Sequence, residues 1–100
     1  MIIDDDPAAR DLAVRMLTGV GFSVEISTNG KEGLAKVQEG FDLVLLDLQM
    51  PVMDGFEFLE ELDSGKHQIV KEPQIIVFSS LLLDEVVSKK LKARCAGILN

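Results

Sequence analysis

Apolar residues occur in two kinds of run along the chain, and the two kinds alternate. Consecutive apolar residues occupy positions 2–3, 43–46, 75–78 and 98–99, and apolar and polar residues alternate at 23–27. Between these runs, apolar residues recur every three or four positions. Runs of the first kind indicate β-strands and those of the second kind indicate amphipathic helices. The pattern therefore predicts the order βαβαβαβαβ.

Two of the predicted strands, at 41–47 and 75–78, are apolar on both faces. Their central residues have the sequences LVLL and IIVF, without a polar interruption. Such strands are typical of parallel sheets that are covered by helices on each side. Repeated βα units predict an α/β fold with a doubly wound, five-stranded parallel sheet and right-handed crossovers.

Each predicted helix begins after a polar residue that can accept hydrogen bonds from the first-turn N–H groups. These capping residues are Asp6, Asn29, Asp54 and Asp84. Asn29 and Asp54 each precede a glutamate by three positions, which is the spacing of a reciprocal capping box. The faces expected to be buried carry Ala9, Leu12, Ala13, Met16, Leu17 and Val20, then Leu34 and Val37, then Phe56, Leu59 and Leu62, and finally Val86, Val87 and Leu91.

Polar side chains follow three of the strands. Asp4 and Asp5 follow the first, Asp47 ends the third, and Ser79 and Ser80 follow the fourth. The carboxyl ends of parallel strands meet at one edge of a sheet, so we expect these residues to converge. Clustered carboxylates repel one another unless a cation lies between them, and oxygen ligands suit Mg²⁺. A fixed carboxylate beside Mg²⁺ can attack phosphorus and form an aspartyl phosphate.

These residues resemble the receiver domain of two-component response regulators. The resemblance rests on the acidic pair after the first strand, on DLQMPVMDG at 47–55 and on IVFSS at 76–80, and it extends over residues 1–100. It implies a flavodoxin-like sheet with strand order 2-1-3-4-5, as in the chemotaxis member of the family.

The resemblance also implies a role for each residue at the strand ends. Asp47 corresponds to the phosphoacceptor and Ser79 to the switch hydroxyl. Asp4, Asp5, Asp47 and the backbone carbonyl of Gln49 correspond to the ligands of Mg²⁺. The implied partner is a sensor histidine kinase or a phosphotransfer protein. The implied function is a phosphorylation-switched signalling domain that controls an output, and not an enzyme with a separate substrate.

The C-terminal part departs from the family pattern. The family's lysine near the end of the fifth strand would fall beyond Asn100, and the position of its switch aromatic holds Ile98. The family's last helix would also fall beyond Asn100, so we expect a receiver domain over residues 1–100 that is incomplete at its C-terminus. One sheet face would then stay partly open. This predicts that either further chain or a partner covers it, and a homodimer or a domain-swapped partner would be such a partner.

Two alternatives fit parts of the pattern. A phosphohydrolase of the haloacid-dehalogenase type also uses an aspartate at a strand end, but it needs a second aspartate two residues later, where this chain has Gln49. A receiver-like docking or dimerisation module without phosphorylation stays open because of the missing lysine position. A separate question concerns residues 81–83, three leucines that are either partly buried or a partner surface.

Charge and composition exclude several further classes. The chain has 10 Lys+Arg and 17 Asp+Glu, a formal net charge of −7, which argues against direct binding to nucleic acid or to an anionic membrane. One cysteine and one histidine exclude a disulfide scaffold and a His-rich zinc site. The apolar runs are too short to span a bilayer, and the N-terminus lacks the basic start of a signal peptide. We therefore expect a cytoplasmic single-domain protein.

Overall fold

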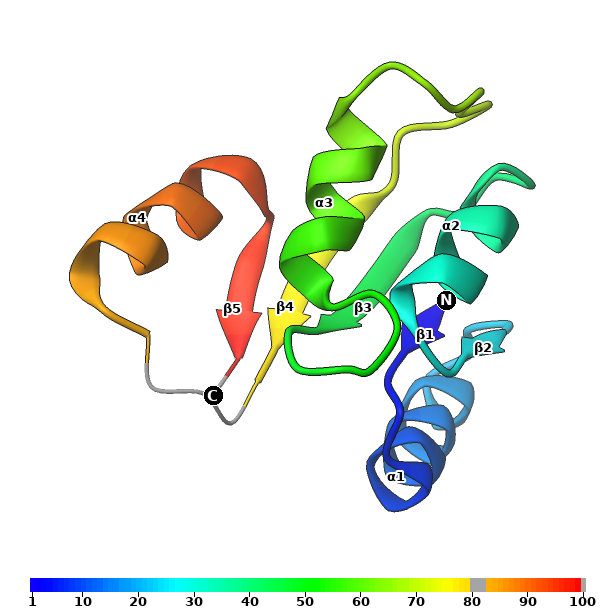
Figure 1. Ribbon diagram of the computed structural model, residues 1–100. Helices are drawn as coiled ribbons and strands as arrows, with labels where there is room; N and C mark the ends of the chain where they lie inside the picture. Colours follow the sequence, from blue (N-terminus) through cyan, green and yellow to red (C-terminus); the bar gives the residue numbers. More distant parts are fainter. Residues whose placement is uncertain (80–82, 100) are drawn as a thin grey trace.

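The computed structural model describes residues 1–79 and 83–99, in which strands and helices alternate as predicted (Figure 1). The five strands are β1 (Ile2–Ile3), β2 (Ile26–Ser27), β3 (Leu43–Asp47), β4 (Gln74–Phe78) and β5 (Gly97–Leu99). The four helices are α1 (Pro7–Gly19), α2 (Gly30–Val37), α3 (Gly55–Asp63) and α4 (Glu85–Arg94). Ser80, Leu81 and Leu82 lie outside the described residues, whereas Leu83 packs against the core.

The strands form one parallel sheet in the order β2-β1-β3-β4-β5, which confirms the predicted fold class and strand order. Ile3 of β1 pairs with Leu46 of β3, so the next residue of each strand is an aspartate at the same edge of the sheet. Asp47 in turn pairs with Phe78 of β4. The register therefore brings the ends of β1, β3 and β4 together.

All four predicted caps accept a hydrogen bond from a first-turn backbone N–H. Asp54 and Glu57 form the complete capping box at the start of α3. The box predicted at α2 is only half formed. Asn29 accepts from the N–H of Glu32, but the Glu32 carboxylate accepts from the Thr28 hydroxyl at 2.8 Å instead of from the N–H of Asn29.

The core lies between one face of the sheet and the helices α2, α3 and α4. Every second residue of β3 and β4 points into it, and these four residues, Val44, Leu46, Ile75 and Val77, are at most 1% exposed. Leu34 and Val37 of α2, Phe58, Leu59 and Leu62 of α3, and Leu91 of α4 complete the same cluster.

The opposite face of the sheet is more open than the strand pattern alone indicates. We expected β3 and β4 to be buried on both faces, but Ile76 is only half-buried and Phe78 is 45% exposed. The expected buried face of α1 is also wrong, because no residue of α1 is buried, and Leu12 and Met16 are more than half exposed. The physical reason is that α1 is the only described helix on this face. The open face agrees with the partly open sheet face expected from the sequence.

Four smaller predictions also need correction. The edge strand β2 is limited to two residues instead of spanning 23–27, and β3 begins at Leu43 instead of residue 41. Phe56 and Val86 were expected on buried helix faces but are exposed. Among the described residues, no helix is both long enough and apolar enough to cross a membrane.

Candidate functional site

Three carboxylates meet at the carboxyl ends of β1 and β3. Oxygen atoms of Asp4, Asp5 and Asp47 all lie within 4.8 Å of one another. Asp4 is buried, Asp47 is half-buried and Asp5 is exposed, so the cluster extends from the interior to the surface. The register of β1 on β3 causes this convergence, because Asp4 and Asp47 each directly follow a paired residue.

The turn between β1 and α1 holds the buried carboxylate in place. The N–H of Asp6 donates to Oδ1 of Asp4 at 2.9 Å, and the N–H of Asp4 donates to the carbonyl of Ser27 at 3.0 Å. The Asp6 side chain accepts from the N–H of Ala8 and so caps α1. Asp6 is therefore a capping residue and is not one of the three clustered carboxylates.

Burial raises the pKa of Asp47 to about 6 from its ordinary value of 3.8. The charges of Asp4 and Asp5 contribute to this rise, while the N–H of Gln49 opposes it by donating to Oδ1 of Asp47 at 3.2 Å. Near neutral pH Asp47 is ionised, in a place that disfavours its charge. A positive group beside Asp47 would therefore stabilise its ionised form.

Backbone hydrogen bonds from two glycines fix the loop that follows Asp47. The N–H of Gly55 donates to the carbonyl of Leu48, and the N–H of Gly30 donates to the carbonyl of Met53. A Cβ on Gly30 would lie 2.7 Å from that carbonyl oxygen, so a side chain does not fit there. The sequence analysis missed Gly30, although a glycine directly after a capping residue is a signal of close backbone approach.

Ser79 lies at the same edge of the sheet, one strand away from Asp47. It directly follows Phe78, the β4 residue that pairs with Asp47, and it is 4% exposed. Its N–H donates to the carbonyl of Leu99 in β5 at 3.1 Å. Gln49 is exposed next to the acidic cluster, two residues after Asp47.

The donor set of the cluster suits a small, hard divalent cation. Three carboxylates offer only oxygen ligands, which is the chemistry of Mg²⁺ sites. Over residues 1–79 and 83–99, no lysine, arginine or histidine side chain forms an ion pair with any of the three. Their mutual repulsion is therefore not offset by a direct ion pair in the described chain.

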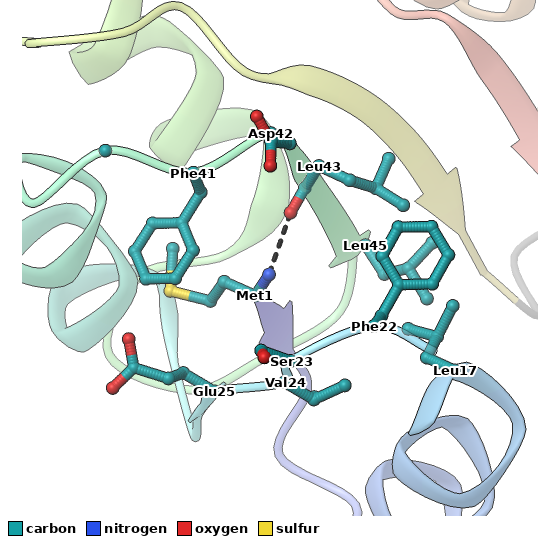
Figure 2. Close-up of a pocket in the computed structure, with 11 residues that line it drawn as sticks. Met1, Leu17, Phe22, Ser23, Val24, Glu25, Phe41, Asp42, Leu43 and Leu45 are labelled. Carbon is teal, nitrogen blue, oxygen red and sulfur yellow. Dashed lines mark hydrogen bonds between the residues drawn. The ribbon is translucent and has the colours of Figure 1, made fainter. Parts of the chain in front are cut away.

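A hollow of about 370 Å³ lies at the other end of the sheet (Figure 2). It surrounds the amino ends of β1 and β3, where the Met1 amino group donates to the carbonyl of Leu43 at 2.8 Å. Burial lowers the pKa of this amino group, although Glu25 and Asp42 act in the opposite direction. None of the predicted site residues lines this hollow.

One family model, described as the response regulator receiver domain, matches residues 1–100. The gliding motility regulatory protein of Myxococcus xanthus is 36% identical over 94 residues, which are 93% of this chain and 12% of that protein. The transcriptional regulatory protein ZraR of Klebsiella oxytoca is 41% identical over 88 residues, 87% of this chain and 19% of that protein. The chain thus spans less than a fifth of either relative.

A solved structure has the same arrangement of elements. The response regulator protein TrrA of Thermotoga maritima, determined in complex with Mg²⁺-BeF, is 27% identical to this chain with a TM-score of 0.77. The match covers 98% of this chain and 81% of that one.

Proposed function

The chain belongs to the response regulator receiver domain family, and we propose that it accepts a phosphoryl group on Asp47 from a phosphohistidine of a sensor histidine kinase or a phosphotransfer protein. The convergence of Asp4, Asp5 and Asp47 within 4.8 Å carries this proposal. Bound Mg²⁺ would neutralise charge on the carboxylates and on the phosphoryl oxygens. The complex of TrrA with Mg²⁺-BeF supports the same chemistry for this fold.

Asp47 is the nucleophile of the proposed reaction. One of its carboxylate oxygens forms a bond to phosphorus while the phosphorus–nitrogen bond of the phosphohistidine breaks. The electron pair of the broken bond stays on the imidazole nitrogen, which takes up a proton. The N–H of Gln49 holds Oδ1 of Asp47 and so restricts the orientation of the carboxylate.

The other site residues bind the cation or respond to the product. Asp4, Asp5, Asp47 and the backbone carbonyl of Gln49 would hold Mg²⁺. Ser79, at the end of the neighbouring strand, would donate its hydroxyl proton to a phosphoryl oxygen. A phosphoryl group adds negative charge and acceptor oxygens, so it favours one packing of the strand ends over another and changes the output.

Phosphorylation by a small-molecule phosphodonor tests the acceptor. With Mg²⁺ present, intact-mass measurement should show one added phosphoryl group that is stable in acid and labile in base. Asp47→Asn should abolish it, because an amide is not a nucleophile here. Asp11→Asn, at an exposed position of α1, is the matched control and should be labelled like the unmodified chain. Equal labelling of Asp47→Asn would refute the assignment.

Titration with Mg²⁺ tests the metal ligands. Asp5 is exposed, so Asp5→Ala should leave the fold intact while it weakens Mg²⁺ binding and slows phosphorylation. Binding is expected to be weak in either case, because Mg²⁺ dehydrates reluctantly. Unchanged affinity in Asp5→Ala would show that Asp5 is not a ligand.

A docking or dimerisation module without phosphorylation is the second candidate. The exposed apolar side chains of α1 and the exposed Phe78 favour it. Uptake of beryllofluoride in the presence of Mg²⁺ separates the two functions, because a pure docking module has no reason to bind a phosphoryl mimic. Absence of uptake would favour docking.

A further inference from the structure

Arg10 is bonded to the turn that carries two of the three clustered carboxylates. Its Nη1 donates to the backbone carbonyl of Asp4 at 3.0 Å, and its own backbone N–H donates to the carbonyl of Asp6 at 2.9 Å. The side chain thus reaches back from the first part of α1 over the turn between β1 and α1. The backbone bond is the regular i→i−4 bond at the start of α1, so the side-chain bond to Asp4 is what ties Arg10 to the turn.

The environment of Arg10 does not suit a role limited to packing. The side chain is half-buried, and its Nε is buried without a hydrogen-bond partner in the described chain. An unsatisfied buried N–H is unfavourable, and an apolar side chain of similar length would avoid that cost. The chain instead has an arginine here, with one N–H bonded to the backbone of a clustered aspartate and with a permanent charge.

We propose that Arg10 is a positioning residue for the acidic cluster. Its guanidinium holds the carbonyl of Asp4, so that the carboxylates of Asp4 and Asp5 stay directed at Asp47, and this placement determines how tightly the cluster binds a divalent cation. The inference rests on the proposed function, because it assigns Arg10 to the same metal site. Arg10 itself ligates nothing, since a guanidinium has no lone pair to offer.

Arg10 could affect the cluster through its charge or through positioning, and the two effects predict opposite changes in cation affinity when Arg10 is replaced. If its positive charge were the main effect, removing it would tighten cation binding, because a repelling charge would be lost. If positioning is the main effect, removing it weakens binding, because the two carboxylates lose their fixed orientation. The proposal is the second reading.

Titration of the chain with Mn²⁺ distinguishes the two readings. Mn²⁺ prefers the same oxygen ligands, and its free-ion signal in electron paramagnetic resonance disappears on binding. Mg²⁺ is then added to displace it. Arg10→Met is expected to weaken binding of both ions by about 2- to 10-fold, the range for loss of one hydrogen bond. Arg10→Lys, which keeps the charge and can make one hydrogen bond, is expected to fall between Arg10→Met and the unmodified chain.

Arg15→Met is the matched control. It removes the same charge from the same helix. Arg15 is exposed, and its side chain makes no hydrogen bond or ion pair to the turn in the described part of the chain. Its affinity for both ions should equal that of the unmodified chain. A second readout is the phosphorylation rate against Mg²⁺ concentration. Arg10→Met should raise the concentration that gives half the maximal rate and change the maximal rate much less.

The outcomes separate this inference from the proposed function. An unmodified chain that binds neither ion overturns both. An unmodified chain that binds, with Arg10→Met binding equally or more tightly, overturns only the role of Arg10. If Arg10→Met does not fold, as judged by circular dichroism, the cation affinity of Arg10→Lys alone tests the positioning role. Weaker binding in that variant supports positioning, and equal or tighter binding overturns it.

Discussion

The backbone N–H of Gly55 donates to the carbonyl oxygen of Leu48 at 3.1 Å, which joins the first residue of α3 to the residue after β3. The two backbones come this close because Gly55 has no side chain. A Cβ at this position would lie 2.8 Å from the Cα of Leu48, and it would also contact the backbone oxygen of Asp47. The start of α3 therefore helps to hold the end of β3, where the proposed phosphoacceptor lies.

Gly55→Ala should disturb this contact and displace the end of β3. We expect the free energy of unfolding to fall by about 1–3 kcal/mol, the range for an overpacked site, and phosphorylation to slow. Urea unfolding measures the first effect. Gly19→Ala is the control, because a Cβ at the end of α1 meets no atom within 4 Å. Equal destabilisation of the two variants would show that close packing is not the cause.

Val52 lies in the loop after Asp47 with a φ of 70°, and it is the only non-glycine residue of the described chain with a positive φ. The left-handed conformation is unfavourable for a β-branched residue by about 1–2 kcal/mol. Its side chain is 74% exposed, so little burial would be lost on substitution. Val52→Asn should therefore raise the free energy of unfolding by about 1 kcal/mol, because asparagine tolerates this conformation.

Val70→Asn is the matched control for that variant. Val70 is 81% exposed and is absent from the residues with positive φ. Its substitution should change the free energy of unfolding by less than about 0.5 kcal/mol. The strain explanation fails if both variants shift the urea midpoint alike.

The raised pKa of Asp47 predicts how stability depends on pH. Its pKa is about 6 in the folded chain against 3.8 ordinarily, so between these values the folded state binds more protons than the unfolded state. The contribution of Asp47 to the free energy of unfolding therefore falls as the pH rises from about 4 to about 6, and it stays low at higher pH. Asp47→Asn should be more stable than the unmodified chain at about pH 7 without divalent ions. The difference should shrink toward about pH 4.

Urea unfolding of both proteins in chelator, across this pH range, measures the effect. Asp11→Asn is the control, because it removes one charge from an exposed position of α1 outside the cluster. If the difference in free energy of unfolding between Asp47→Asn and the unmodified chain does not change with pH, the raised pKa of Asp47 is not its cause.

Gln49 should set how long the phosphoryl group survives on Asp47. It is exposed two residues after Asp47, where its side chain can position or block the attacking water. Substitutions of different size and polarity at this position should change the dephosphorylation rate several-fold. Decay of the labelled protein after donor removal measures the rate. One common rate across the series would contradict this role.

The open face of the sheet should promote self-association. A hollow of about 180 Å³ between α1 and the sheet has an almost wholly apolar lining that includes Leu12, Met16 and Phe78, all of them substantially exposed. Replacing Leu12 and Met16 together by glutamine should reduce the sedimentation-measured association of the 100-residue chain. Val86→Gln on α4 is the control, because Val86 is exposed but does not line this hollow. Equal loss of association in the control would locate the interface elsewhere.

Features that depend on a few neighbouring residues were predictable from the sequence. The four helix starts follow from Asp6, Asn29, Asp54 and Asp84, because a cap needs only its own first turn. The parallel sheet follows from the alternation of strands and helices. The meeting of the three acidic residues follows from parallel strands, which end at one edge.

Burial was the least predictable feature, because it depends on which segments cover a surface and not on the surface itself. The run IIVF at 75–78 indicated two covered faces, yet the structure covers one face well and leaves Phe78 45% exposed. Amphipathic spacing likewise placed Leu12 and Met16 on a buried face that the fold does not bury.

The chain's own local chemistry thus determined where each helix begins, which segments are strands and which acidic residues follow them. Tertiary structure alone decided two further features: the close approach of Gly30 to the Met53 carbonyl and the exposure of Leu12, Met16 and Phe78 on the open face of the sheet. Caps and strand patterns need partners a few positions away. Both features depend on which distant segments meet in space, and a local pattern does not specify the partner.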